Sequence, residues 1–173
     1  MIEERKDGAV SLHKHIVGLL VEDRAGVLTK VAGLFARRGF NIDTIVVGKT
    51  NRAGVSHIVI SLFGDDRTLE QVEKQANKLI NVIKVIDLNE KHSVVREHCL
   101  LKVSAVDAEK RQDIVNYCAL HKANALNVDD DSVIIEIVGS PQKIDSFLEL
   151  MQKFGVKEVS RTGINAMQRN GEK

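Results

Sequence analysis

One order of apolar runs and amphipathic segments occurs twice along this 173-residue chain, and this repetition constrains the fold more than any single motif. Short β-branched runs are typical of strands, whereas apolar residues recurring every three or four positions indicate helices. The strands expected in the first half are 16–21, 42–48, 55–63 and 82–88. Those expected in the second half are 98–106, 123–128, 132–138 and 156–162. A helix is expected after the first and the third strand of each half, so both halves read β-α-β-β-α-β.

Terminal residues and apolar stripes mark the four expected helices. The first starts near Val27 and ends at Gly39, which suits the positive φ of a helix C-terminus. The second is expected to start at the capping-box pattern Thr68-x-x-Gln71, the third spans 109–122, and the fourth starts at Ser140-Pro141. The residues expected to face the core are Val27, Leu28, Val31, Leu34 and Phe35, then Leu69, Val72, Ala76, Leu79 and Ile80, then Ile114, Val115 and Cys118, and finally Ile144, Phe147, Leu148 and Met151.

This order predicts the α+β class, with two ferredoxin-like βαββαβ domains in tandem. Each domain would be a four-stranded antiparallel sheet with two helices on one face. The expected boundaries are a flexible N-terminal arm at 1–14, a first domain at 15–90, a linker at 91–97 and a second domain at 98–173.

Composition excludes several classes of protein. The net charge of +1 gives no electrostatic reason to expect nucleic acid or an anionic membrane as a partner. The charged N-terminus lacks the apolar core of a signal peptide, and the run 16–21 is too short to span a bilayer. Cys99 and Cys118 show no CxxC spacing, which favours reduced, buried thiols. We therefore expect a cytoplasmic protein.

Ferredoxin-like units serve many functions, so function depends on particular residues. Stacking of RNA bases requires aromatic side chains on the middle strands, but the chain is 3% aromatic and the strand 55–63 carries only Phe63. A small phosphate-cleaving enzyme would need a basic loop after the first strand, whereas the loop 22–26 is Glu-Asp-Arg-Ala-Gly. No nucleophile with an adjacent base is apparent. The sequence therefore disfavours both an RNA-binding and a catalytic role.

The six histidines raise the question of a metal site: His13, His15, His57, His92, His98 and His121. Only His13-x-His15 places two of them at a ligand-like spacing, and that pair lies near the expected arm. Surface or hydrogen-bonded histidines are therefore favoured over metal ligands, and no metal is expected.

The residues that frame the first helix fit a small-molecule sensor. A loop that runs directly into a helix leaves backbone N–H groups unpaired, and together with the helix dipole these suit a carboxylate. Gly26 lets a ligand approach that backbone closely, and Asp23 either caps the helix or holds an ammonium group. Asn41 offers both a donor and an acceptor, and the apolar wall would come from Val27, Leu28 and Ile42. The alternative is equally weighted on these residues alone: Asp23 and Gly26 shape a helix entrance, and Asn41 completes a turn.

The stretch from Val21 to Ile42 closely resembles the opening of ACT domains, and among these it is most similar to the small, regulatory subunit of acetolactate synthase (acetohydroxyacid synthase). In that family a strand precedes Glu-[Asn/Asp]-x-x-Gly-[Ala/Val]-Leu, then Gly-Leu-Phe, Arg-Gly and Tyr/Phe-Asn-Ile, and each has a match here. The resemblance continues at 69–75, 95–97 and 160–163, and it covers almost the whole chain after the arm.

The resemblance implies a regulatory subunit that is not catalytic and holds no cofactor itself. A separate catalytic (large) subunit would use thiamine diphosphate, magnesium and FAD to join two pyruvates, or pyruvate and 2-oxobutyrate. The regulatory subunit would activate it and confer feedback inhibition, usually by valine, in branched-chain amino acid biosynthesis. The N-terminal ACT domains would form a homodimer through their second strands, with the effector at the seam. The residues that would hold it are Asp23, Gly26, Val27 and Leu28 of one copy, and Asn41 and Ile42 of its partner.

Two departures qualify what the resemblance implies. Asp23 stands where many members of the family have asparagine, and a carboxylate would attract the effector's ammonium but repel its acid group. The second domain has Val-Asp-Ala-Glu at 106–109, without the glycine, so we expect no effector there. The alternative function is a stand-alone sensor with two ACT domains that controls another enzyme or a transcription factor.

Overall fold

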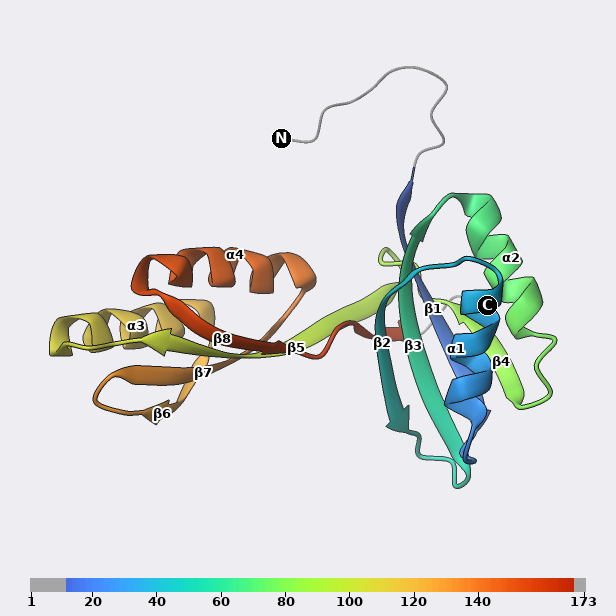
Figure 1. Ribbon diagram of the computed structural model, residues 1–173, viewed down its shortest axis with the longest axis horizontal. Coiled ribbons are helices and arrows are strands. Elements are labelled where there is room, and N and C mark those ends of the chain that lie inside the picture. Colours follow the sequence, from blue (N-terminus) through green and yellow to red (C-terminus); the bar gives the residue numbers. More distant parts are fainter. Residues whose placement is uncertain (1–11, 170–173) are drawn as a thin grey trace, which may run out of the picture. The chain divides into compact units, whose positions relative to one another are not determined.

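The computed structural model describes residues 12–169, which divide into two compact units (Figure 1). Among the described residues, the first unit comprises 12–94 and 166–169, and the second comprises Val95–Asn165. Most of the arm expected at 1–14 lies outside the described residues.

The first unit is a four-stranded antiparallel sheet with two helices. Its elements are β1 (His13–Glu22), α1 (Val27–Arg37), β2 (Ile42–Lys49), β3 (Val55–Gly64), α2 (Asp66–Ala76) and β4 (Val82–Asp87). The strand order β2-β3-β1-β4 places β2 and β4 at the two edges. This is the arrangement that the β-α-β-β-α-β order predicts.

The core of the first unit lies between the sheet and its two helices. Alternation along β1 sends Val17 and Leu19 to the helix side, where both are fully buried. They pack in one cluster with Phe35 of α1 and Val72 of α2. The inward-facing side chains of the helices and of the strands thus form a single apolar layer. This layer fixes α1 against the sheet and so fixes the position of its first turn.

The second unit repeats the plan of the first. The elements that follow β4 are β5 (Ser93–Ser104), α3 (Ala108–His121), β6 (Asn124–Val128), β7 (Ser132–Gly139), α4 (Pro141–Met151), the short 3-10 helix η1 (Gln152–Phe154), β8 (Val156–Arg161) and β9 (Asn165–Gln168). The order β6-β7-β5-β8 matches that of the first sheet, and β9 pairs with β5. Its core includes Leu101, Ile135, Ile144 and Phe147. The tandem ferredoxin-like fold is therefore confirmed.

The expected boundaries differ from the observed ones at three places. The strand β1 already begins at His13, because its pairing with β3 continues as far as Gly64. The strand β5 begins at Ser93, inside the expected linker 91–97. The strand β9, which no sequence pattern predicted, belongs from Ala166 onward to the first unit rather than to the second.

Some helix ends and some buried helix faces also differ from those expected. The N-cap of α2 is Asp65, whose carboxylate accepts a hydrogen bond from the N–H of Thr68, so Thr68 lies within the first turn. The helix ends at Ala76, and Ile80, expected in the stripe, is 92% exposed. Leu28 and Val115 were also expected to face the core, but they are exposed on α1 and α3.

Two predictions about helix ends are confirmed. Gly39 adopts a positive φ of 69° after α1, and Ser140 caps α4 by accepting a hydrogen bond from the N–H of Lys143 ahead of a proline at the first position. Among the helices of residues 12–169, none is both long enough and apolar enough to cross a bilayer.

Candidate functional site: the open entrance of α1

The helix α1 begins differently from the other three α-helices of residues 12–169. Its N-cap is Gly26, and no side chain caps it. By contrast, α2, α3 and α4 begin with a side-chain oxygen that accepts a hydrogen bond from a backbone N–H of the first turn; the capping residues are Asp65, Asp107 and Ser140. The expected alternative role of Asp23 as a helix cap is therefore wrong, and the entrance of α1 is open.

The open entrance leaves backbone donors without a protein acceptor. Within residues 12–169, the N–H groups of Leu28 and Thr29 have no acceptor, while Val27 N–H makes a 3.3 Å contact with the carbonyl oxygen of Arg24. Such groups carry the partial positive charge of the helix N-terminus and suit an anion. Gly26 has φ of 82°, and a Cβ built there meets nothing within 4 Å, so the backbone is open to a small ligand.

Asp23 lies at the rim of this entrance. Its backbone N–H donates to the carbonyl oxygen of Gly54 at 2.9 Å, which ties the loop after β1 to the β2–β3 hairpin. Its side chain is exposed. The structure therefore places Asp23, Gly26, Val27 and Leu28 together at one end of the first sheet.

Asn81, Glu22 and Lys30 form a polar brace that holds the entrance in place. Its central residue, Asn81, was not predicted from the sequence. The side chain of Asn81 donates to a carboxylate oxygen of Glu22 at 2.7 Å and accepts from the ammonium of Lys30 at 2.9 Å. The carbonyl oxygen of Asn81 also accepts from the N–H of Glu22 at 3.0 Å. Asn81 thus joins the end of β1 to α1, but it lies far from both in sequence, so only the tertiary fold reveals the role.

The start of β2 lies at the opposite end of the same sheet from the entrance of α1 (Figure 1), and Ile42 is the first residue of β2, directly after Asn41. Glu22, just before the entrance, pairs with Val55 of β3, whereas Ile42 pairs with Leu62 of the same strand. Those two β3 residues are seven positions apart, about 23 Å at the rise of an extended strand. One copy of the chain therefore does not bring the two halves of the expected site together.

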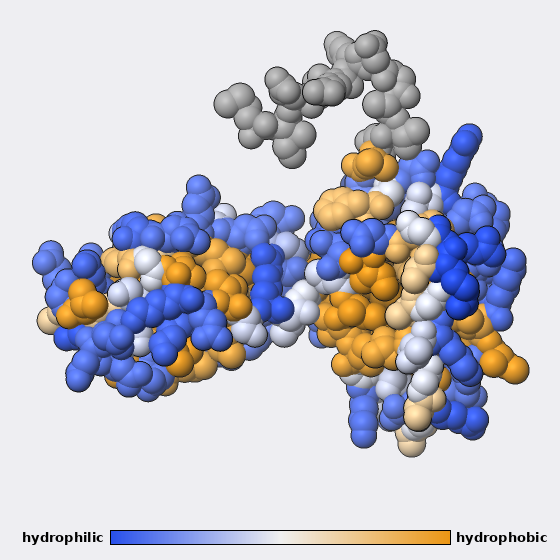
Figure 2. Space-filling model, viewed as in Figure 1, coloured by the Kyte–Doolittle hydropathy of each residue, from blue (hydrophilic) through white to orange (hydrophobic). Residues whose placement is uncertain are grey.

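The edge strand β2 presents apolar side chains beside this entrance. Ile45 and Val47 pair with the core residues Ile60 and Ile58, so they point to the helix-covered face of the sheet. They are nevertheless 36% and 47% exposed, and Leu28 on α1 is 46% exposed. Figure 2 shows apolar surface gathered on the first unit over β2 and β3. We call Leu28, Ile45 and Val47 the β2 patch.

The corresponding entrance in the second unit is closed. Asp107 is the N-cap of α3, and its carboxylate accepts a 2.7 Å hydrogen bond from the N–H of Lys110. This hydrogen bond is the main reason why the pKa of Asp107 is lowered from its ordinary value. A carboxylate of the protein thus already occupies the position that a ligand's carboxylate would take.

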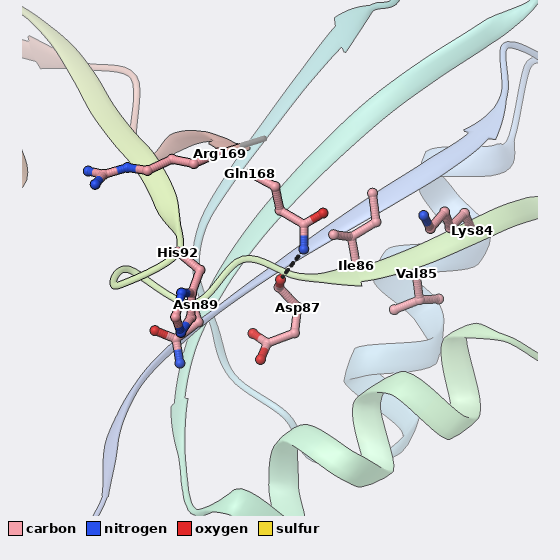
Figure 3. A pocket seen from close by; sticks show the side chains of 8 residues that line it. All are labelled: Lys84, Val85, Ile86, Asp87, Asn89, His92, Gln168 and Arg169. Carbon is pink, nitrogen blue, oxygen red and sulfur yellow. Dashed lines mark hydrogen bonds between the residues drawn. The ribbon is translucent and has the colours of Figure 1, made fainter. Parts of the chain in front are cut away.

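A separate open pocket of about 390 Å³ lies beside β4 (Figure 3). Its lining includes Lys84, Asp87, His92 and Arg169, and the side-chain amide of Gln168 donates to the carbonyl oxygen of Asp87 at 3.3 Å. None of the expected site residues lines it. The entrance of α1 is instead an exposed surface, and its distinguishing feature is its unpaired N–H donors rather than a cavity.

The two cysteines are free and buried, as expected. Burial raises the pKa of the Cys99 thiol and of the Cys118 thiol, so both are held as neutral thiols. They are core residues of the second unit.

Two ferredoxin-like units in tandem place this chain in the class of proteins built on the ACT-domain fold, with the uncapped helix entrance in the first unit. The model of an acetohydroxyacid synthase small-subunit-like ACT domain matches residues 17–84, and the model of the small subunit of acetolactate synthase matches residues 96–170. The chain belongs to the acetolactate synthase small-subunit family.

Individual relatives agree with this assignment. The chain is 48% identical, over 90% of its length and 92% of the relative's, to the protein of Methanothermobacter thermautotrophicus named "Probable acetolactate synthase small subunit". It is 41% identical, over the same shares, to the acetolactate synthase small subunit of Mycobacterium bovis. The crystal structure of the small subunit from Thermotoga maritima superimposes with a TM-score of 0.85 and 42% identity, covering 92% of this chain and 99% of that one.

Proposed function

We propose that this chain is the non-catalytic regulatory subunit of an acetolactate synthase, that it activates the catalytic subunit, and that it confers feedback inhibition by valine. Membership of the small-subunit family supports the first part. The observation that carries the sensing role is the uncapped entrance of α1, since the other three described α-helices are capped by side chains.

Each end of a free valine has a suitable group at this entrance. The carboxylate accepts hydrogen bonds from the N–H groups of Leu28 and Thr29, with the helix dipole behind them. The ammonium is attracted by the carboxylate of Asp23 or by the side-chain oxygen of Asn41 from a second copy. The isopropyl group packs on Val27 and Leu28 and on Ile42 of the second copy.

The second copy supplies the missing half of the site through the β2 edge. The end of β2 at Lys49 lies at the same end of the sheet as the entrance of α1, because Lys49 pairs with Ser56. If two β2 strands pair antiparallel across a two-fold axis, the start of one lies beside the end of the other. Asn41 of the second copy then comes to the entrance of α1, and the β2 patch is covered.

Inhibition follows from the shared position of the ligand. A valine that contacts both copies favours one packing of the two first units over another. The catalytic subunit prefers the other packing, so valine binding weakens activation. Couplings of this kind are typically about 1–3 kcal/mol, which changes activity by several-fold or more.

The chemistry belongs to the catalytic subunit in this proposal. That partner holds thiamine diphosphate, magnesium and FAD, and no cofactor is assigned to this chain. The second candidate, a stand-alone sensor acting on another enzyme or a transcription factor, requires no catalytic subunit.

Reconstitution tests the proposal. We expect the purified chain, mixed with the catalytic subunit from the same cell, to raise the rate of acetolactate formation, and we expect valine to reverse that increase. A chain that binds valine but leaves the rate unchanged would favour the stand-alone sensor. A chain that activates without any response to valine would refute the sensing role and leave the subunit assignment in place.

A further inference from the structure

Two histidines and a carboxylate meet at the start of β1, away from the entrance of α1. His13 and His15 are two residues apart on β1, so both side chains lie on one face of the strand. The residue opposite His13 is Gly64, the last residue of β3. The chain passes from there through Asp65 into α2, whose first residue is Asp66. The corner between β3 and α2 thus places Asp66 beside the two histidines.

The ligand atoms of this cluster are close enough to share one ion. One ring nitrogen of each histidine and one carboxylate oxygen of Asp66 all lie within 4.8 Å of one another. His13 Nε2 is 3.2 Å from Asp66 Oδ1, and the centroids of the two imidazole rings are 4.2 Å apart. Two ligands of a tetrahedral zinc ion are about 3.3 Å apart at zinc–nitrogen bond lengths of about 2.0–2.1 Å. The His13–Asp66 pair already has this spacing, and the exposed side chains of both residues can adjust the rest.

His15 is nearly buried, and one of its ring nitrogens is held by the backbone. It is 7% exposed, and its Nε2 lies 3.1 Å from the backbone carbonyl oxygen of Asp65. A carbonyl oxygen only accepts, so Nε2 carries the hydrogen, and in the neutral ring Nδ1 keeps its lone pair. A ligating histidine usually donates its other ring N–H to such a carbonyl or carboxylate. Asp65 is itself fixed, since its carboxylate accepts from the N–H of Thr68 at 2.8 Å.

We propose that His13, His15 and Asp66 bind one divalent first-row transition-metal ion, best represented by Zn²⁺, with the fourth position open to water. Two imidazoles and one carboxylate form a donor set that suits zinc and its neighbours rather than Mg²⁺ or Ca²⁺. The ion joins the start of β1 to the start of α2 and thereby stabilises the first unit. This inference does not depend on valine binding. The histidine spacing alone favoured surface histidines over metal ligands, and only the fold brings Asp66 to His13 and His15.

Metal titration of the full chain without a histidine tag tests the proposal. After treatment with a chelator, the chain is titrated with Zn²⁺ against a competing indicator, and with Co²⁺ by its visible absorption. We expect one tight equivalent per chain. Removing an outer-shell partner typically weakens metal binding about 10–100-fold, so His13→Ala and Asp66→Asn, which each remove a direct ligand, should weaken it at least as much.

The matched controls are His92→Ala and Glu90→Gln, an exposed histidine and an exposed carboxylate elsewhere in the first unit. We expect both to bind zinc as the unchanged chain does. Because His13 and Asp66 are exposed, circular dichroism of their variants should remain that of the folded protein. The proposal is overturned if the unchanged chain binds no equivalent of metal, or if His13→Ala and Asp66→Asn bind it as tightly as the controls.

Discussion

At the scale of single residues, Gly26 has two properties that matter at the entrance of α1. It adopts φ of 82°, which L-residues rarely do, and it adds no side chain over the open N–H groups. A substitution therefore has two separable effects, strain in the backbone and obstruction of the entrance. Only the second should depend on the charge of the new side chain.

We predict that Gly26→Asp abolishes inhibition by valine and leaves activation of the catalytic subunit intact. The new carboxylate lies where the ligand's carboxylate would bind and repels it, since like charges close together are unfavourable. The measurement is the rate of acetolactate formation by the reconstituted enzyme as valine is increased.

Gly26→Ala separates strain from charge in that experiment. Strain at a left-handed position costs about 1–3 kcal/mol of stability, and we expect this variant to be destabilised but still partly sensitive to valine. If Gly26→Asp remained fully inhibitable, or if it lost activation instead, the assignment of the entrance would be wrong.

Asp107 allows a prediction about pH in the second unit. Replacing a capping aspartate by alanine leaves a backbone N–H of the first turn without its acceptor, so Asp107→Ala should lower the free energy of unfolding at pH 7. The pKa of Asp107 is lowered in the folded chain, chiefly by the N–H of Lys110. Its contribution is therefore fully present above the ordinary aspartate pKa of about 4. It is lost as the pH falls through the lower folded pKa.

Urea unfolding at pH 7 and at about pH 3 measures this effect. We expect the stability difference between Asp107→Ala and the unchanged chain to shrink at the lower pH. Asp113→Ala, an exposed aspartate further along α3, is the control and should show little difference at either pH. A difference for Asp107→Ala that stays constant between the two pH values would contradict the role of its charge in the cap.

The helix caps show what residue patterns can and cannot predict. Ser140 was identified correctly because a hydroxyl followed by proline fits few positions other than a helix start. For α2, the pattern Thr68-x-x-Gln71 suggested that the helix starts at Thr68. The N-cap is instead Asp65, three residues earlier, whose carboxylate accepts hydrogen bonds from both the N–H and the hydroxyl of Thr68. Several capping residues in succession leave the start ambiguous in the sequence.

At the scale of elements, β2 pairs on one side only, with β3, and carries exposed apolar side chains. It is an edge strand, and an exposed edge with apolar side chains is suited to pairing with another chain. The β2 patch lies on its helix-covered face, where neither α1 nor α2 buries it fully. The proposed dimer covers both features at once.

We predict that Val47→Lys weakens the dimer and with it the response to valine. The new ammonium would lie in the apolar seam between two β2 strands, where burying an unpaired charge is unfavourable. Ile83→Lys is the matched control, because Val47 is 47% and Ile83 is 48% exposed, and Ile83 lies on β4, the opposite edge strand.

Analytical ultracentrifugation over a range of concentrations measures the apparent mass of the two variants. We expect a lower apparent mass for Val47→Lys and an unchanged mass for Ile83→Lys. The opposite pattern, with Ile83→Lys dissociating first, would place the contact between copies at β4.

The order of elements could be predicted from the sequence, and some of their ends could not. Apolar periodicity and β-branched runs identified four helices and eight strands, including β6, which has no buried residue. The four-residue strand β9 has only one buried residue, Ala166, so it carries no such pattern. Leu28 and Ile80 were misassigned because they share the helical spacing of the core stripe or continue it beyond the end of the helix.

At the scale of the whole molecule, one fold appears twice with different helix entrances. The first unit has an open entrance at Gly26, and the second has an entrance closed by Asp107. The fold class could be predicted from the sequence, and so could the position of Asp23, Gly26, Val27 and Leu28 around the start of the first helix, whose role in binding stays a prediction. The brace through Asn81 and the cluster of His13, His15 and Asp66 could not, since they depend on contacts between residues far apart in the chain.

We predict that the purified chain forms no acetolactate from pyruvate, even when thiamine diphosphate, magnesium and FAD are supplied. The chemistry is assigned to the catalytic subunit, and adding that subunit should restore product formation. A colorimetric assay for acetolactate measures both. Product formed by this chain in the absence of the catalytic subunit would contradict the non-catalytic assignment.

The most direct test of the central claim is a crystal structure of the chain grown with saturating valine. We expect valine between two copies, with its carboxylate within hydrogen-bonding distance of the N–H groups of Leu28 and Thr29 of one copy and with Asn41 of the other copy beside it. An empty entrance at saturating valine, or valine held wholly within one copy, would contradict the claim.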